Sequence, residues 1–172
     1  MTLVFDATPL NYLGKIDRLD VVADLDRNLV VPGRVYKEVV GEGMKHDYAD
    51  AKRINALGRD GTIKQQAFEK NDQFEQLVQS TPLSPADVAV ILLADELEGS
   101  AVLDEDYGRT VAETEGVETR GTAYLVLSRV KDGEMEPEDA REIIDGMLDA
   151  GWYCSTDLYS KILRKLEEFA PE

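Results

Sequence analysis

The stretch "LVFDATPLNYLGKI", residues 3–16, decides the fold class of this chain. Its first three residues are apolar and suit a buried β-strand, whereas Leu10, Leu13 and Ile16 have the spacing of a helix's apolar face. Between the two lies Asp6, a carboxylate placed where the apolar strand ends. A charge so close to a hydrophobic core is costly unless it has a partner. The stretch therefore predicts a strand, then a helix, and an acid at their junction whose position needs an explanation.

The same alternation of short apolar runs and helical patterns continues along the chain. Strands that alternate with helices are typical of an α/β fold with a parallel sheet covered on both faces. Pro32 is expected in the first turn of its helix, where proline is tolerated. The strands are expected at 3–5, 29–32, 61–68, 100–104 and 117–121, and the helices at 9–16, 32–41, 47–57, 71–80, 84–97, 107–115, 122–131, 137–149 and 156–169.

The charge balance is extreme for a chain of 172 residues, of which 43% are hydrophobic. The sequence has 35 acidic and 19 basic residues, so its formal net charge is -16. Disordered acidic tails do not explain this charge, because the acids are interleaved with apolar residues along the whole chain. An acidic partner surface remains open. We favour adaptation to high salt, since salt screens the repulsion among dense carboxylates.

Several classes of protein are excluded by composition. The sequence has one cysteine, Cys154, which rules out an internal disulfide and a cysteine-based metal cluster. The N-terminus lacks the basic and apolar regions of a signal peptide. No apolar run is long enough to span a bilayer. The protein is therefore expected to be soluble and cytoplasmic, with no membrane partner.

Four acids occupy positions that suit a common site. Asp6 and Asp104 each follow a predicted strand, and the carboxyl ends of parallel strands border the ligand crevice of an open sheet. Glu38 lies within the helical stretch "VYKEVV", and Asp87 lies in the first turn of the helix that Ser84 is expected to cap. Each of the last two has a simpler explanation: Glu38 as part of a solvated helix face, and Asp87 as a charge at a helix N-terminus.

Converging carboxylates repel one another unless a cation lies between them. Mg²⁺ and Mn²⁺ prefer carboxylate and water oxygens, and such ions activate water and stabilise a phosphodiester during displacement. The sequence offers no serine–histidine or cysteine–histidine pair for a different chemistry, and its one histidine, His46, has no evident place in the site.

Five blocks in order give the chain a resemblance to PIN-domain proteins of the VapC-like ribonuclease superfamily, in the branch with a long C-terminal helical extension. The blocks cover nearly the whole chain and are weakest over residues 43–82. They are "FDATPLNYLGKI" (5–16), "VVPGRVYKEVV" (30–40), "LSPADVAVILLADELEGSAVLDEDYGRTVAE" (83–113), "GVETRGTAYLVLSRVKDGEM" (116–135) and "AGWYCSTDLYSKIL" (150–163).

The resemblance implies a Rossmann-like three-layer α/β/α sandwich with a central, mainly parallel sheet. It also implies a PIN-like nuclease domain over residues 1–135 and a helical extension over residues 136–172 packed on the same domain. Active members of the family are Mg²⁺- or Mn²⁺-dependent ribonucleases, so the resemblance implies one of these ions as the cofactor.

Position by position, the resemblance assigns the family's catalytic and metal-binding quartet. This branch more often has a glutamate where Asp87 stands, so the reach of that acid is one methylene shorter here. Thr8 is expected either to hydrogen-bond Asp6 or to cap the helix ahead of Pro9. The quartet is Asp6, Glu38, Asp87 and Asp104, and the possible auxiliary residues are Thr8, Glu105, Asp106 and Arg109.

Two functions remain open from the sequence. The first is an endoribonuclease that cleaves RNA, as the toxin of a toxin–antitoxin pair with an antitoxin partner and a homodimeric state. The second is a nucleic-acid-binding or regulatory module with a degenerate site. The presence of all four acids favours the first. Net negative charge opposes RNA binding, but salt screens it and Arg34, Lys37 and Arg109 are expected to form a small basic rim.

Overall fold

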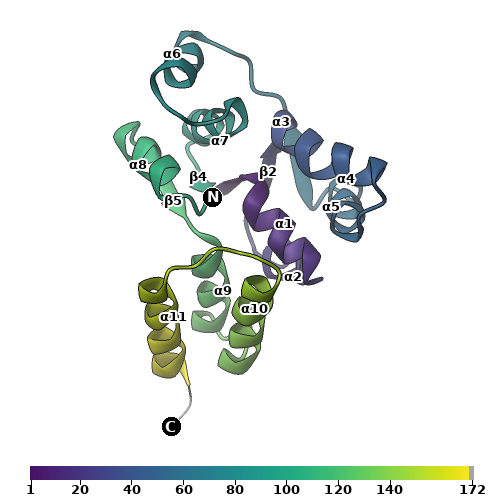
Figure 1. Cartoon of the computed structure of the whole chain (residues 1–172), viewed down its shortest axis with the longest axis vertical. Coiled ribbons are helices and arrows are strands. Elements are labelled where there is room, and N and C mark those ends of the chain that lie inside the picture. The colour runs from purple at the N-terminus through teal and green to yellow at the C-terminus, as the bar shows by residue number, and fades with distance from the viewer. Residues whose placement is uncertain (171–172) are drawn as a thin grey trace.

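The strands of the sheet are short, apolar and parallel to one another. The computed structural model describes residues 1–170, and the strands in this range form a five-stranded sheet in the order β3-β2-β1-β4-β5 (Figure 1). The register places Val4 of the central strand beside Val30 on one side and Ala101 on the other. The strands are β1 (Thr2–Phe5), β2 (Asn28–Pro32), β3 (Ile63–Gln66), β4 (Ser100–Val102) and β5 (Glu118–Arg120).

Helices cover both faces of this sheet, as expected for the three-layer α/β/α fold. Figure 1 shows α6, α7 and α8 on one side and α1, α2, α5 and α9 on the other. The helices before β4 are α1 (Ala7–Lys15), α2 (Asp20–Ala23), α3 (Gly33–Tyr36), η1 (Lys37–Gly41), α4 (Glu42–Lys45), α5 (Ala49–Arg59), α6 (Asp72–Ser80) and α7 (Pro85–Glu96). Those after β4 are α8 (Asp106–Thr114), α9 (Thr122–Lys131), α10 (Pro137–Asp149) and α11 (Thr156–Phe169).

The strand order creates a switch point at the centre of the sheet. The chain runs from β1 outward to β2 and β3, then returns to β4 on the other side of β1 and continues to β5. Ligand crevices of open α/β sheets form outside the carboxyl ends of the strands where the order reverses in this way. Asp6 directly follows β1, and Asp104 follows β4 by two residues. The two acids thus flank the switch point.

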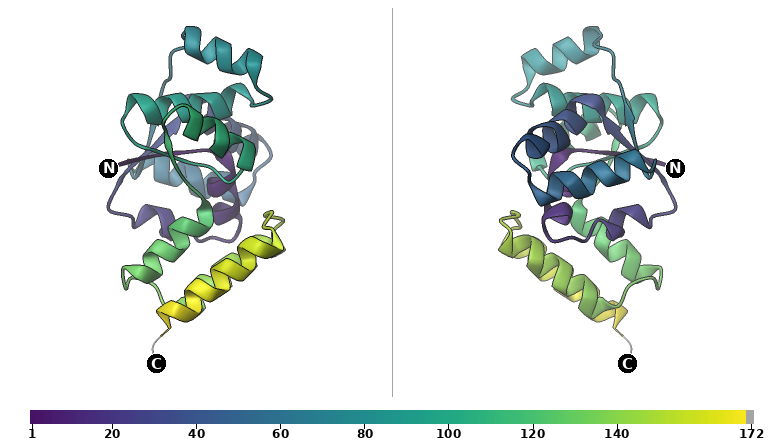
Figure 2. Two further views of the ribbon diagram at one scale, coloured as in Figure 1. Left: turned by 90° about the vertical axis from the view of Figure 1, so that its left-hand side faces the viewer. Right: turned by 90° about the vertical axis from the view of Figure 1, so that its right-hand side faces the viewer.

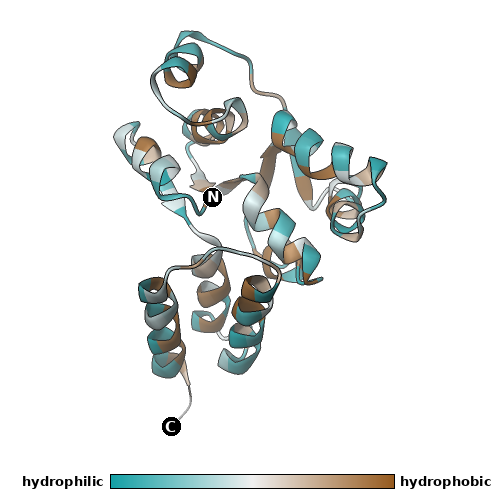
Figure 3. Ribbon diagram, viewed as in Figure 1, coloured by the Kyte–Doolittle hydropathy of each residue, from teal (hydrophilic) through white to brown (hydrophobic). Residues whose placement is uncertain are grey.

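Helix α7 has a continuous buried stretch at its centre. Every residue from Val88 to Ala94 is buried, and the helix packs against β1, β2 and β4. Figure 3 shows this helix and the central strands as mainly hydrophobic, while the helices at the periphery present one polar face. A helix that is apolar all round must be enclosed. Its rigid N-terminal end therefore holds Asp87 in a fixed position beside the sheet.

The helix predicted over 32–41 is different in the structure. Pro32 is the last residue of β2, where it pairs with Gln66, and the helix begins at Gly33. Residues Lys37–Gly41 then form a π-helical turn, η1, before the chain continues into α4. Such turns are rare and occur often at functional sites. This one contains Glu38.

The three C-terminal helices form a small bundle against the rest of the fold. Helices α9, α10 and α11 contact one another, and α10 also contacts α1 (Figure 2). Arg18, in the turn after α1, binds Asp139 of α10 through two hydrogen bonds of 2.8 and 3.0 Å. The side chains of Met147, Trp152 and Ile162 are buried. The boundary expected at residue 135 stays a prediction.

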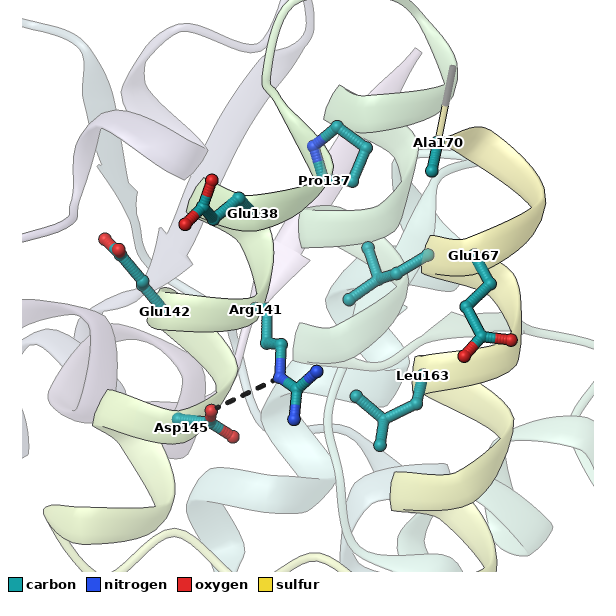
Figure 4. A pocket seen from close by; sticks show the side chains of 9 residues that line it. Pro137, Glu138, Arg141, Glu142, Asp145, Leu163, Glu167 and Ala170 are labelled. Atoms are coloured by element: carbon teal, nitrogen blue, oxygen red, sulfur yellow. Dashed lines mark ion pairs between the residues drawn. The ribbon is translucent and has the colours of Figure 1, made fainter. Parts of the chain in front are cut away.

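A hollow of about 530 Å³ lies between α10 and α11, at the end of the hairpin away from their connecting turn. Figure 4 shows Arg141 beside Asp145, with an Nε–Oδ2 distance of 3.8 Å, and Leu163 and Glu167 on the facing helix. Four carboxylates and one cation line this hollow, so its charge does not suit a polyanion. Its lining residues are Pro137, Glu138, Arg141, Glu142, Asp145, Leu163, Leu166, Glu167 and Ala170.

In the described part of the chain, no helix combines the length and the hydrophobicity needed to cross a membrane.

Candidate metal centre

An acidic hollow opens at the switch point of the sheet. It has a volume of about 360 Å³, and its walls come from the ends of β1 and β4, the N-terminus of α7 and the turn between α10 and α11. Three of the four predicted site acids line it together. The lining residues are Asp6, Thr8, Tyr12, Asp87, Asp104, Glu105, Gly151, Trp152 and Tyr153.

Asp6 lies at the centre of this acidic group. It occupies the N-cap position of α1, but its side chain makes no capping hydrogen bond, and its backbone N–H donates to Val102 of β4 at 3.0 Å. Burial, together with the charges of Asp87, Glu38 and Asp104, raises the pKa of its carboxyl to about 7, against an opposing hydrogen bond from the Ala7 backbone. In the absence of a cation, this carboxylate is costly to ionise.

Asp87 has a structural partner as well as a place in the hollow. Its Oδ2 accepts a hydrogen bond from the backbone N–H of Ser84 at 3.1 Å, while its own N–H donates to the Ser84 hydroxyl at 3.1 Å. This is a capping box, which satisfies two N–H groups at the start of α7. Asp87 therefore caps α7 and also faces the acidic hollow, since only one of its oxygens bonds to Ser84.

Asp104 is held by three donors. Its Oδ1 accepts from the backbone N–H of Thr122 at 2.7 Å, and its Oδ2 accepts from the Thr122 hydroxyl at 2.7 Å and from the Trp152 indole N–H at 3.1 Å. The close approach requires Gly121, because a Cβ there would lie 3.1 Å from Oδ1 of Asp104. The carboxylate is thus fixed in orientation at the wall of the hollow.

Glu38 is the one acid of the predicted quartet that lies outside the acidic hollow. It is exposed on η1 and does not line the hollow, yet its charge contributes to the raised pKa of Asp6. The π-helical turn rotates the residues that precede it relative to those that follow. The sequence pattern places Glu38 on a helix, but it does not reveal this turn.

The auxiliary residues separate into two groups. Thr8 and Glu105 line the acidic hollow, whereas Asp106 and Arg109 do not. Thr8 is not the helix cap, contrary to one of the two roles expected for it, because α1 begins one residue earlier and Asp6 is its N-cap. Arg109 donates from Nε to the Thr119 hydroxyl at 3.3 Å. Among residues 1–170 it forms no ion pair with a carboxylate.

The predicted basic rim is not continuous. Arg34 and Lys37 line a separate hollow of about 260 Å³ beside β2 and β3, together with Gln65 and Phe68. The guanidinium of Arg34 also lies 5.5 Å from the ring centre of Phe74. Of the three cations expected at the rim, these two are therefore directed elsewhere.

The α10–α11 turn supplies residues that sequence reasoning missed. Gly151, Trp152 and Tyr153 line the acidic hollow, and the Tyr12 hydroxyl donates to the Gly151 carbonyl at 3.3 Å. Trp152 is 4% exposed and contacts Asp104, which is 48 positions away in the sequence. The only signal for this turn was its place within the last block of the resemblance. Nothing in its local pattern indicates a contact with a strand-end acid.

The chemistry of this donor set fits a hard divalent cation. Asp6 is a part-buried carboxylate with three other acids near it, which is the situation that a cation relieves. Within residues 1–170, however, no three acidic, histidine or cysteine side chains are arranged so that they could hold one ion as they stand. The oxygens of Asp87 and Asp104 are turned partly toward other donors. That all four acids share one ion stays a prediction.

Comparison with one solved structure agrees with the fold. A PilT N-terminus domain protein from the archaeon Sulfolobus solfataricus P2 is similar in structure, with a TM-score of 0.52 and 16% identity over 74% of this chain and 92% of that chain. A domain of a functionally unknown protein from Methanocaldococcus jannaschii gives a TM-score of 0.47 with 14% identity, over 70% of this chain and 89% of that one. No curated protein matches the chain.

The sequence itself provides the stronger assignment. A family model described as a PIN domain matches residues 2–168, which is nearly the whole chain and includes the tail helices α10 and α11. PIN domains are generally nucleases that act on nucleic acids and typically use divalent metals. The chain belongs to the PIN-domain family.

Proposed function

We propose that this protein is an endoribonuclease that depends on Mg²⁺ or Mn²⁺ and cleaves RNA at the acidic hollow. The observation that carries the proposal is Asp6, a part-buried carboxylate whose pKa is raised to about 7 by burial and by three neighbouring acids. Asp6 shares one hollow with Asp87 and Asp104, and a cation bound there would relieve the cost of ionising it. The family assignment indicates what such a cation would do there.

The residues have distinct roles in this proposal. Asp6, Asp87, Asp104 and Glu38 hold the ion, with Asp104 oriented by Thr122 and Trp152. When bound, the metal supplies charge neutralisation and Lewis-acid activation of water and of a phosphodiester. A carboxylate set of this kind requires oxygens that are fixed in direction, and the three hydrogen bonds to Asp104 supply this condition.

Glu105 and Thr8 are the auxiliary residues with access to the same hollow. Glu105 is exposed at the N-cap of α8, and its side chain makes no capping hydrogen bond. It is therefore available to accept a proton from an attacking water. Asp106 lies outside the acidic hollow, so Glu105 is the better candidate to assist Asp104.

The test compares wild type with Asp6→Asn on one fluorescent single-stranded RNA, with Mn²⁺ and with EDTA. A neutral amide is a poor ligand for a hard cation, so Asp6→Asn is expected to lose cleavage by at least about 100-fold. Asp26→Asn, at an exposed acid away from the hollow, is the matched control and retains activity. A DNA strand of the same sequence tests whether the activity is restricted to RNA.

Two results would contradict the proposal. Equal cleavage by wild type and Asp6→Asn would mean a contaminating nuclease or a wrong site. No cleavage of several RNAs by folded wild type with metal would favour a nucleic-acid-binding module with a degenerate site. The toxin role, the antitoxin partner and the homodimer stay predictions. A small antitoxin-like reading frame directly upstream of the gene would support the first two, and sedimentation tests the third.

A further inference from the structure

A second hollow adjoins the acidic one and is larger, with a volume of about 570 Å³. We call it the tyrosine groove. Its walls are the start of α8, the start of α9, the α10–α11 turn and the exposed face of α11, so the C-terminal helices form half of it. The lining residues are Asp104, Glu105, Asp106, Tyr107, Arg109, Gly121, Ala123, Tyr124, Leu127, Trp152, Tyr153, Cys154, Ser155, Leu158, Lys161, Ile162 and Lys165.

Exposed aromatic rings are concentrated in this groove. Tyr107 is 44% exposed, Tyr124 is 50% exposed and Tyr153 is 84% exposed. Of the tyrosines in residues 1–170 that are exposed to this degree, only Tyr48 lies elsewhere. Aromatic rings in water present flat faces on which nucleic-acid bases stack, and this contact tolerates any base. One face of Tyr124 is covered by the guanidinium of Arg120, 4.8 Å from the ring centre, so its opposite face is the one that a base would meet.

Three cations line the groove together with three acids, Asp104, Glu105 and Asp106. Lys161 is exposed on α11 and makes no ion pair within the described residues, and Arg109 makes none either. Lys165 pairs with Glu168 of its own helix at 3.1 Å, but both side chains are more than half exposed, so the pair is weak. These three cations balance the three carboxylates of the lining in number, so the groove is less acidic than a chain with a net charge of -16 is on average. The cations suit phosphate groups.

The tyrosine groove is continuous with the acidic hollow. Asp104, Glu105, Trp152 and Tyr153 line both. Tyr153 therefore stands where the two meet, and a strand lying in the groove would bring its next phosphodiester to the proposed metal-binding acids. Arg109 and the two lysines line the tyrosine groove but not the acidic hollow.

We propose that the tyrosine groove binds single-stranded RNA by stacking its bases on Tyr107, Tyr124 and Tyr153. The phosphates lie against Lys161, Lys165 and Arg109, and the strand leads into the acidic hollow. The proposal rests on the proposed function for the chemistry at the end of the groove. Stacking is weakened little by salt, whereas phosphate contacts are screened. A highly acidic nuclease in high salt therefore gains most of its substrate affinity from such rings.

The test measures binding without cleavage. A short fluorescent 2′-O-methyl RNA strand is titrated in EDTA against wild type, Tyr107→Leu, Tyr124→Leu and Tyr153→Leu, and read by anisotropy. Each substitution is expected to weaken binding by about 10-fold, the loss typical of one stacked base. Tyr48→Leu is the matched control, because Tyr48 is 57% exposed but lies outside the groove, and it leaves affinity unchanged.

Two further readouts locate the bound strand. Trp152 is the only tryptophan of the sequence and lines the groove, so binding should quench the protein's intrinsic fluorescence. Lys161→Gln and Lys165→Gln should each reduce the slope of log affinity against log salt by about 0.7, the value for one phosphate contact of a single strand. Lys64→Gln, at an exposed lysine on β3, should leave that slope unchanged.

The outcomes separate this proposal from the proposed function. Wild-type affinity in all three groove variants would overturn the groove, and so would a duplex that binds as tightly as the single strand. A change in self-association, seen by sedimentation while RNA affinity stays constant, would make the groove a protein interface and overturn the proposal as well. In each of these cases the cleavage test on Asp6→Asn is unaffected, because that variant changes no groove residue.

Discussion

Among single residues, Asp6 has the charge state that depends most on what binds beside it. Its pKa is raised to about 7 from an ordinary value of 3.8, chiefly by burial. The folded protein therefore binds this proton more tightly than the unfolded chain does. Between about pH 4 and pH 7 the free energy of unfolding falls as pH rises, because the folded state must then ionise a part-buried acid.

We expect this fall in EDTA to be at most about 4 kcal/mol, the equivalent of a shift of about three pKa units. Asp6→Asn should remove the part of the pH dependence due to this group and be more stable than wild type above pH 7. Adding Mg²⁺ should restore wild-type stability there, since metal binding favours the ionised carboxylate. Denaturant unfolding of wild type, Asp6→Asn and Asp26→Asn across pH measures each effect. A wild-type stability that rises through this range would exclude the assignment to Asp6.

Asp104 gives a second prediction, through the donors that orient it. Thr122 is fully buried and donates its hydroxyl to Oδ2 of Asp104 at 2.7 Å. Thr122→Val keeps the volume but removes this donor, so Mn²⁺ affinity should fall by about 10-fold or more. Thr122→Ser retains the hydroxyl and should bind Mn²⁺ nearly as wild type does. Calorimetric titration of Mn²⁺ into the three proteins gives the comparison, and equal affinities would show that Asp104 does not need the bond.

Asp87 and Asp104 show which contacts of a single residue can be predicted from the sequence and which cannot. The capping box of Asp87 is local, three residues from Ser84, and the pattern around Pro85 predicts its first half, Ser84 as the N-cap. The partners of Asp104 are distant, because Thr122 and Trp152 come from a later helix and a later turn. Contacts of that kind depend on how the elements pack, and periodicity along the chain contains no information on them.

Among the elements, the helical segment from Gly33 to Lys45 contains three glycines, of which Gly41 and Gly43 have opposite surroundings. Gly41 ends η1 with ordinary helical angles, φ -57° and ψ -54°, and a Cβ there would meet no atom within 4 Å. Gly43 is buried, and a Cβ there would collide with the Cβ of Ala51 in α5.

Gly41→Ala should therefore stabilise the protein by about 0.5–1 kcal/mol, because alanine restricts the unfolded chain and fits the helix. Gly43→Ala should destabilise it by about 1–3 kcal/mol, because α4 and α5 must separate. Unfolding midpoints in denaturant, compared at equal slopes, give both values. Stabilisation by both substitutions would mean that α4 does not pack on α5 as described.

Element order was predictable from the sequence because it depends on local spacing. The tail helices α10 and α11 occupy the predicted residues 137–149 and 156–169. The short helix α2 and the π-helical turn η1 were not predicted. Four residues give too little periodicity to identify a helix, and a π-helical turn differs from an α-helix by one inserted residue that the hydrophobic pattern does not mark.

At the scale of the whole molecule, repulsion among 35 acidic residues opposes folding and RNA binding together. The Debye length is about 30 Å at 0.01 M salt and about 3 Å at 1 M. In dilute buffer the carboxylates therefore repel across the whole protein, and in molar salt only neighbouring ones do so. Protein–RNA contacts through phosphates weaken as salt rises, so the two effects of salt on activity have opposite signs.

We expect stability to decide the balance, so that the free energy of unfolding and the rate of RNA cleavage are both higher in about 1 M KCl than in dilute buffer. Denaturant unfolding and the cleavage assay are run across one KCl series. A triple variant, Glu96→Gln, Glu113→Gln and Asp132→Asn, removes three exposed acids outside the acidic hollow and the tyrosine groove. It should reach its maximal stability at lower KCl, because fewer charges need screening. If instead stability is independent of KCl and the triple variant behaves as wild type, the acids do not limit folding, and a surface for a basic partner becomes the better explanation of the charge.

Because the Tyr107, Tyr124 and Tyr153 rings bind without counterion release, cleavage should persist in salt that abolishes binding through Lys161 and Lys165 alone.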